Sequence, residues 1–274
     1  MKRLKILVLA AIGWLCGMGV SAQGLQPGGL SYAPLLSNTE KKAEVVLTGA
    51  AKGTTKAVIP AKVTLNGKTY RVVGIAKGAF SLQEELTSVV IPGSVISIGY
   101  EAFNACKKLT SVQIPNSVTS MENGVFSGCS SLTSVVEHKG VPYIPYKAYY
   151  YCVGLESVVI PNYVTRIEPL AFNGCRNMTS LHIGSQITFI GGNAFNDCGK
   201  LSHIYIEAPD PGKIKITESP FMSATYENAK LYVPKESVDA YKNTLPWSRF
   251  KNILTEWNIE KNDNVLTNTA GVGM

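Results

Sequence analysis

Five cysteines are the residues of this 274-residue chain best suited to chemistry, and they recur with a 23-residue period. They are Cys106, Cys129, Cys152, Cys175 and Cys198. Cysteines form disulfides, bind zinc as thiolates or act as nucleophiles. Their odd number, and their place three residues after a recurring aromatic, favour a row of small buried free thiols. Disulfides between neighbouring positions stay open as an alternative, whereas thiols stacked along a line do not converge on a tetrahedral zinc.

A column of serines that ends in a histidine raises the question of a hydrolase. The column is Ser88, Ser111, Ser134, Ser157 and Ser180, followed by His203. A serine nucleophile needs an imidazole base and an orienting carboxylate. The sequence has no G-x-S-x-G motif, and no motif places a carboxylate beside these residues. We therefore interpret the serines as a consequence of repetition and predict no catalytic residue.

The chain has three histidines, His138, His182 and His203. In the 23-residue register, His182 and His203 are expected on adjacent strands, both outward, as diagonal neighbours. Such a pair suits a metal or a catalytic imidazole, and it suits an ordinary binding face as well. Because no metal-ligand spacing and no phosphate-binding loop is present in the sequence, we predict neither a metal nor a cofactor.

An internal repeat must position all of these residues. Aliphatic, aromatic and cysteine positions recur in separate columns with the same period, and the aromatic column is Phe80, Phe103, Phe126, Tyr149, Phe172 and Phe195. A single unit of this length cannot bury its apolar side chains alone, so we expect successive units to stack as coils of a solenoid. Each column then becomes a continuous row of like side chains in the core.

Each repeat is expected to contain two extended pieces and one tight turn. The segment L-T-S-V-x-I alternates apolar and outward residues, which predicts a short strand, and Pro92, Pro115 and Pro161 end it. A second extended piece follows around Val95, Val118 and their equivalents. The A-F-x-x-C segment suits a single helical or 3₁₀ turn.

One complete repeat reads Ala102-Phe103-x-x-Cys106-x-x-Leu109-Thr110-Ser111-Val112-x-Ile114-Pro115. This motif resembles the BspA-like leucine-rich repeats of bacterial surface proteins, and the likeness covers roughly residues 75–206. The resemblance implies a curved solenoid with a parallel sheet on its inner face, export and, in some members, adhesion to host proteins or other bacteria. We therefore predict an α/β leucine-rich-repeat solenoid, mostly β, with parallel strands stacked at a 23-residue period, short helical or 3₁₀ turns and a cap at each end.

The chain is expected to divide into five segments. Residues 1–22 have the basic start, short apolar stretch and Val20-Ser21-Ala22 cleavage signal of a secretory leader. Residues 23–74 are expected to form an N-terminal segment and β cap, with a hairpin turned at Asn66-Gly67. The solenoid is expected over 75–206, a C-terminal cap over 207–257, and a flexible tail over 258–274.

The net charge and its distribution along the sequence indicate which classes of partner the protein can bind. The formal charge of +7 falls to +4 without the leader, and the remaining basic residues form no long run. A nucleic-acid partner is therefore not expected. Beyond the leader, no stretch is long and apolar enough for a transmembrane helix.

Two surfaces are candidates for binding. The first is the outward, concave face of the long strands, because concave solenoid faces commonly bind extended partners. Its residues are Ser88, Val90, Ser111, Gln113, Ser134, Val136, Ser157, Val159, Ser180, His182, His203 and Tyr205. The second is the tyrosine-rich repeat, with Tyr143, Tyr146, Tyr150 and Tyr151, since tyrosines on a rigid surface are good anchors. In this repeat Glu137 replaces a core residue, and we expect the strand to end near Val136 so that Glu137 turns to solvent.

Three functions are compatible with these patterns. The first is an exported, secreted or cell-surface recognition protein that binds a protein or glycan of a host or of neighbouring bacteria. The second is a structural spacer without a dedicated ligand, and the third is a hydrolase of envelope polymers. The resemblance favours the first, although a fold does not determine a function.

Overall fold

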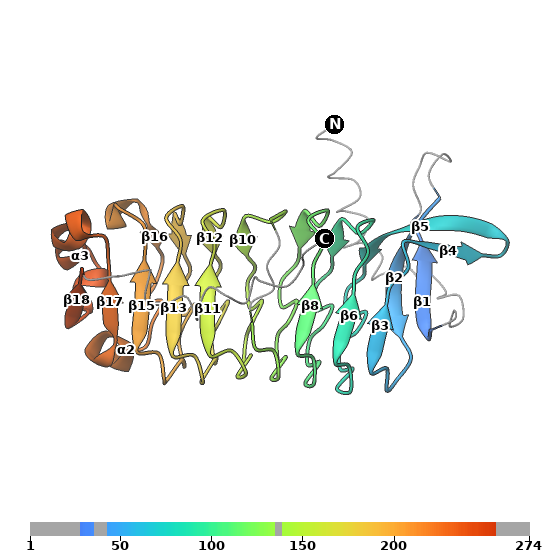
Figure 1. Ribbon diagram of the computed structural model, residues 1–274, viewed down its shortest axis with the longest axis horizontal. Coiled ribbons are helices and arrows are strands. Elements are labelled where there is room, and N and C mark those ends of the chain that lie inside the picture. The colour runs from blue at the N-terminus through green and yellow to red at the C-terminus, as the bar shows by residue number, and fades with distance from the viewer. Residues whose placement is uncertain (1–27, 36–42, 135–138, 256–274) are drawn as a thin grey trace, which may run out of the picture.

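The computed structural model describes residues 28–35, 43–134 and 139–255 as one elongated stack of coils. Strands follow one another along the long axis from the N-terminal to the C-terminal end (Figure 1). Pairing is parallel between successive coils, and through most of the stack each residue pairs with its equivalent in the next repeat. The 23-residue solenoid expected from the sequence is therefore confirmed.

The long strands form the first sheet of the solenoid, in two sections. The N-terminal section contains β3 (Lys56–Val58), β6 (Ser88–Val90) and β8 (Ser111–Gln113). The C-terminal section contains β11 (Ser157–Ile160), β13 (Ser180–Ile183), β15 (His203–Ile206), β17 (Lys230–Tyr232) and β18 (Asn252–Leu254). Residues 135–138, between the two sections, lie outside the described residues. The predictions for Val136, Glu137 and His138, among them the strand end near Val136, therefore fall outside the described part of the chain.

The second extended pieces form another parallel sheet, also in two sections. The first contains β2 (Glu44–Ala50), β5 (Lys68–Ile75), β7 (Ser97–Ile98) and β9 (Ser120–Met121). The second contains β10 (Tyr143–Ile144), β12 (Arg166–Ile167), β14 (Phe189–Ile190) and β16 (Lys215–Ile216). At the N-terminal end, β1 (Leu30–Pro34) runs antiparallel to β2. The expected hairpin is formed by β4 (Lys62–Leu65) and β5.

The A-F-x-x-C segments bind the coils together through alternating hydrogen bonds. The N–H of Phe103 donates to the Val125 carbonyl of the next coil at 2.9 Å, and that of Ala105 donates to Ser127 at 2.7 Å. The N–H of Cys106, in contrast, donates within its own coil to the Phe103 carbonyl. Alternate donors are thus used between coils, so the expected helical turn is realised as a succession of turns rather than as a continuous 3₁₀ helix.

This alternation requires left-handed backbone at two positions of every complete coil. The positions hold Gly78, Glu101, Gly124, Lys147, Leu170 and Asn193, and four residues later Leu82, Ala105, Gly128, Tyr151, Gly174 and Asp197. All twelve have positive φ, between 51° and 79°. Most are not glycine, although side chains disfavour this region. The hydrogen bonds between coils, rather than the conformational preferences of the individual residues, therefore determine the left-handed backbone at these turn positions.

Seven stacked rings form the centre of the core. Six are the predicted aromatics, from Phe80 to Phe195, and neighbouring centroids lie 5.1–5.7 Å apart. The seventh is Phe221, which stacks on Phe195 at 5.4 Å although the step between them along the chain is longer than the regular repeat. The extra residues are accommodated in the segment before it, which contains η1 (Pro211–Lys213). The ring column thus continues beyond the regular repeat.

Short helices and aromatic side chains cover the last ring. The helices are α2 (Ser223–Asn228), η2 (Lys235–Ser237), α3 (Val238–Asn243) and η3 (Trp247–Arg249). Trp247 and Phe250 contact Phe221 edge-on, and both are buried. Within the segment expected to form the C-terminal cap, α3 carries Tyr241, which is fully buried. Strand β18 pairs beyond β17 and is the last strand of the first sheet.

The ring column generates a stability prediction. Phe126 is fully buried between Phe103 and Tyr149, so Phe126→Ala leaves a cavity in the middle of the stack. We expect a loss of about 3–5 kcal/mol in the free energy of unfolding, measured by denaturant titration. The exposed substitution Val90→Ala is the control and should change stability by less than about 0.5 kcal/mol. A loss below about 1 kcal/mol for Phe126→Ala would show that the rings are not core.

Candidate binding surfaces

The cysteines lie in the core as free thiols and make one repeated contact. Each Sγ donates to the carbonyl of the aromatic residue of the preceding coil, at 3.1–3.3 Å. All five side chains are buried. A thiol is a weak donor and a small apolar group, so it fills the space below a ring while satisfying a buried carbonyl. The predicted thiol row is therefore confirmed, and the disulfide alternative is not realised.

Burial also keeps four of these thiols, those of Cys129, Cys152, Cys175 and Cys198, protonated. It raises the pKa of Cys152 and of Cys198 to about 12, and it raises that of Cys175 well above its ordinary value. For Cys129, the contact with the Cys106 thiol is the largest cause of the raised pKa, and burial adds to it. The thiolate is the nucleophile and the metal ligand. Near neutral pH these side chains therefore act as packing groups.

The outward positions of the first sheet form a face that we call the sheet face. One column is Val58, Val90, Gln113, Val159, His182, Tyr205, Tyr232 and Leu254. The other is Lys56, Ser88, Ser111, Ser157, Ser180, His203, Lys230 and Asn252. The predicted sheet-face residues within the described segments lie in these columns, apart from Ser134, which is exposed and lies between β9 and β10, before the gap in the described residues. Val136 lies in that gap.

Four rings gather on the C-terminal part of the sheet face. This aromatic cluster consists of His182, His203, Tyr205 and Tyr232, from β13, β15 and β17. Tyr205 stacks on Tyr232 at 4.6 Å, and centroids lie 6.1 Å apart for His182 with Tyr205 and for His203 with Tyr232. The rings stack along the solenoid axis, as the coils do. A ligand above the sheet therefore meets mainly ring edges and polar ring atoms.

The two histidines make different polar contacts. His182 Nε2 lies 2.9 Å from Glu207 Oε1, and His203 Nδ1 lies 3.0 Å from Ser202 Oγ. The serine and the carboxylate thus contact different imidazoles, whereas a hydrolytic triad needs both on one. In the serine column itself, Ser180 donates to Ser157 at 2.8 Å. Within the described residues, no group of three or more His, Cys, Asp or Glu side chains is placed to hold a metal ion.

The tyrosine-rich repeat forms a second surface on the turns. Tyr146, Tyr150 and Tyr151 make up this tyrosine belt. Lys147 Nζ lies 5.3 Å and 5.0 Å from the rings of Tyr146 and Tyr150, and Tyr150 contacts Tyr151 edge-on at 4.5 Å. Arg176 lies over Tyr151 and pairs with Asp197 at 2.8 Å. The belt is therefore a surface of aromatic and basic side chains.

Tyr143, predicted to share this surface, lies elsewhere. It begins β10 in the second sheet, and its hydroxyl donates to the Met121 carbonyl at 3.2 Å. Partial burial raises its pKa. Tyr143 thus connects two coils of the second sheet across the interruption between β9 and β10. It lies in a strand, whereas Tyr146 lies in the turn that follows.

The repeats of this chain match those of a known protein family. The family model described as the BspA type leucine-rich repeat region matches in six copies, over residues 73–202 and 142–253. The chain belongs to this family. Its repeats therefore extend past Ile206, in agreement with the continued ring column at Phe221. A search of curated proteins gives no significant match.

Solved structures of bacterial leucine-rich repeat proteins share this fold. The T. pallidum leucine-rich repeat protein is 21% identical, with 77% of this chain and 86% of that chain covered and a TM-score of 0.57. A leucine-rich repeat protein from Eubacterium ventriosum is 23% identical, with 71% and 50% covered and a TM-score of 0.54. At these identities the likeness shows the fold alone. No helix in the described part of the chain is long and apolar enough to cross a membrane.

Burial of the thiols predicts their reactivity. In the folded protein at pH 8, without reductant, the five repeat cysteines should react with a disulfide reagent far more slowly than an exposed thiol, because burial denies the reagent access to them. In denaturant the protein without residues 1–22, which carry Cys16, should titrate five thiols, and its Cys152→Ala variant should titrate four. A count of one or three in denaturant would reveal disulfides. Rapid reaction of the folded protein would contradict the buried row.

Proposed function

We propose that this BspA-type protein is an exported recognition scaffold that binds a protein or a glycan of a host or of neighbouring bacteria, without catalysis. The aromatic cluster on the sheet face is the proposed contact surface. Export is supported by the leader-like residues 1–22, which lie outside the described residues. Membership of the BspA-type family favours a binding role, since these repeats serve as scaffolds.

The composition of the sheet face is the observation that carries this proposal. Side chains on this face point away from the core, so the solenoid does not require them to be aromatic. The earlier coils hold serine, valine and glutamine there, whereas the last coils hold His182, His203, Tyr205 and Tyr232. Tyrosine buries a large area at a small entropic cost and is enriched among residues that dominate binding energy. Three strands of one sheet hold these rings in place.

The spacer and hydrolase alternatives differ from the proposal in what they predict. A spacer needs no aromatic residues on an exposed face, and it predicts no saturable partner. A hydrolase predicts turnover that depends on His182 or His203. The separate pairing of these imidazoles, with Glu207 and with Ser202, supports a binding role over a catalytic one.

Binding measurements with paired substitutions test the proposal. The protein is screened against an array of host matrix proteins and bacterial and host glycans, and the affinity of the strongest partner is measured. Tyr205→Ala combined with Tyr232→Ala should weaken it at least about tenfold, as expected for the loss of central contact residues. Val90→Ala, on the same face but in an early coil, is the matched control and should leave the affinity unchanged.

Other outcomes distinguish the alternatives. Loss of binding in Tyr146→Ala with Tyr151→Ala, but not in the sheet-face variant, would move the site to the tyrosine belt and contradict the proposed surface. An array without any saturable partner would favour the spacer. Turnover of an envelope polymer that disappears in His182→Ala or His203→Ala would contradict the absence of catalysis.

A further inference from the structure

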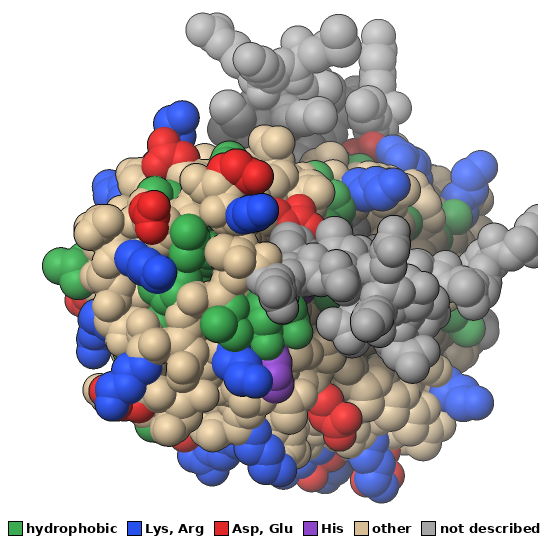
Figure 2. Space-filling model, turned by 60° about the vertical axis from the view of Figure 1, so that its left-hand side comes forward, with side chains coloured by type: hydrophobic (Ala, Val, Ile, Leu, Met, Phe, Trp, Pro, Cys, Tyr) green, Lys and Arg blue, Asp and Glu red, His purple; other side chains and the backbone are tan. Residues whose placement is uncertain are grey.

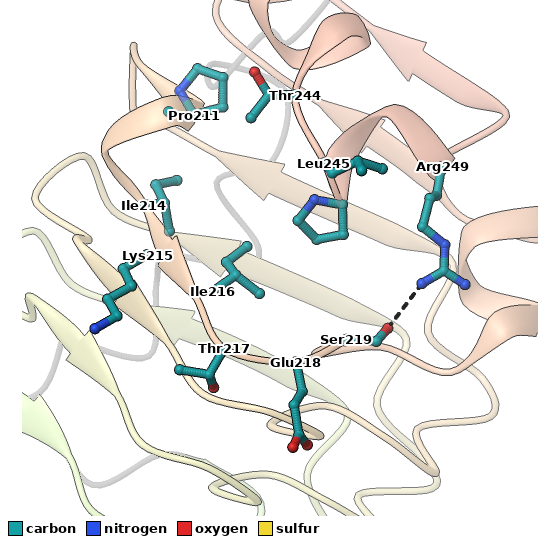
Figure 3. Close-up of a pocket in the computed structure, with 12 residues that line it drawn as sticks. Pro211, Ile214, Lys215, Ile216, Thr217, Glu218, Ser219, Thr244, Leu245 and Arg249 are labelled. Atoms are coloured by element: carbon teal, nitrogen blue, oxygen red, sulfur yellow. Dashed lines mark hydrogen bonds between the residues drawn. The ribbon is translucent and has the colours of Figure 1, made fainter.

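An open cleft of about 540 Å³ lies beside β16, near the C-terminal end of the stack. Figure 2 shows hydrophobic and basic side chains close together on this end of the molecule. Ile214 and Ile216 form one wall of the cleft, and Leu245 and Pro246 form the other (Figure 3). Leu245 is 76% exposed, although it is large and apolar. The cleft therefore offers apolar walls to a ligand of modest size, within the range typical of small-ligand sites.

The edge of the second sheet runs along this cleft. The sheet ends at β16, whereas the first sheet continues through β17 and β18. The N–H of Lys215 donates to the Thr188 carbonyl at 2.8 Å, toward β14. Consecutive residues of a parallel strand direct their backbone groups to opposite edges, so the groups of Ile216 face the other way. An extended chain can pair with such an edge.

A basic group stands at one end of the cleft. The Arg249 guanidinium carbon lies 4.1 Å from the centroid of the Tyr226 ring, and Nη1 donates to Ser219 Oγ at 3.3 Å (Figure 3). These contacts orient the guanidinium while leaving it exposed. Within the described part of the chain, no carboxylate forms an ion pair with it. Glu218 also lines the cleft but forms no ion pair with Arg249, and an oriented guanidinium without an ion-pair partner among the described residues is well suited to a carboxylate, which it can bind through two hydrogen bonds.

We propose that this cleft binds the C-terminal end of a peptide: an extended, apolar segment with a free carboxylate. Its backbone pairs with Ile216 at the edge of β16, its apolar side chains contact Leu245, Pro246 and Ile214, and its terminal carboxylate binds Arg249. The three features select one class of ligand. A neutral glycan does not use the apolar walls, a fatty acid does not use the strand edge, and an internal peptide segment does not supply the carboxylate.

The cleft is separate from the sheet face, so a failure of either proposal leaves the other untouched.

The ligand class is tested with acetyl-Ala-Val-Leu-Leu bearing a free carboxylate and with the same peptide as a C-terminal amide. Each peptide is titrated into the full protein, and binding is followed by NMR. The acid should bind at least about tenfold more tightly than the amide. N-methylation of the backbone amides of the acid should weaken it by a similar factor, because strand pairing is then blocked.

Protein variants identify the residues involved. Arg249→Gln should remove the preference for the acid over the amide, and Arg249→Lys should retain part of it. Leu245→Ser should weaken both peptides several-fold, and it keeps the test valid if Arg249→Gln is unstable, because Leu245 is exposed. Arg71→Gln is the matched control, since Arg71 is a half-exposed arginine at the other end of the stack, and it should change nothing.

Three results would overturn the proposal. Equal binding of acid and amide would remove the role of the carboxylate. Tighter binding of decanoate than of the peptide acid, weakened in turn by Leu245→Ser, would assign the cleft to a different ligand. Failure of both peptides to bind at millimolar concentration would show that the cleft is not a peptide site.

Discussion

Hydrogen bonding between successive coils is the constraint on which the rest of the structure depends. Through most of the stack, two sheets and the intervening turns bond to the next coil, so most positions lie beside their equivalents in the following repeat. The same register stacks the rings from Phe80 to Phe195 and aligns the five thiols with the carbonyls of preceding coils. It even holds residues such as Lys147 and Leu170 in left-handed backbone. Stacking between coils therefore overrides the backbone preferences of individual residues in the solenoid.

The repeat made the fold predictable because one period recurs in many independent columns. The solenoid, the positions of the long strands and the buried thiols all followed from it, whereas the hairpin at Asn66-Gly67 followed from its turn residues. The parts that were missed are those where the period fails or where the backbone alone decides. Phe221 joins the ring column across a step longer than the regular repeat, and β18 has no repeat motif. The alternating bonds of the turns depend on φ values that side-chain patterns do not encode.

The binding surfaces were predictable to a smaller degree, because a column shows which way a side chain points but not what it contacts. His182, His203 and Tyr205 were expected on one face, and the structure gathers them with Tyr232, which lies beyond the regular repeat. Sequence proximity suggested that Tyr143 joins Tyr146, yet it lies in the other sheet. The cleft at β16 has no motif at all, since its walls come from two separate segments of the irregular C-terminal region.

Hydrogen exchange of individual backbone amides tests the central claim most directly. The N–H groups of Phe103, Ala105, Phe126 and Gly128 lie in turns, yet each donates to the next coil at 2.7–2.9 Å. In-register stacking requires these amides to exchange as slowly as the strand amides of His203 and Lys230, which donate to Thr179 and Ser202 of the preceding coil, and to do so only when the stack opens. Exchange at the rates of free loops in the folded protein, measured by NMR, would contradict the account.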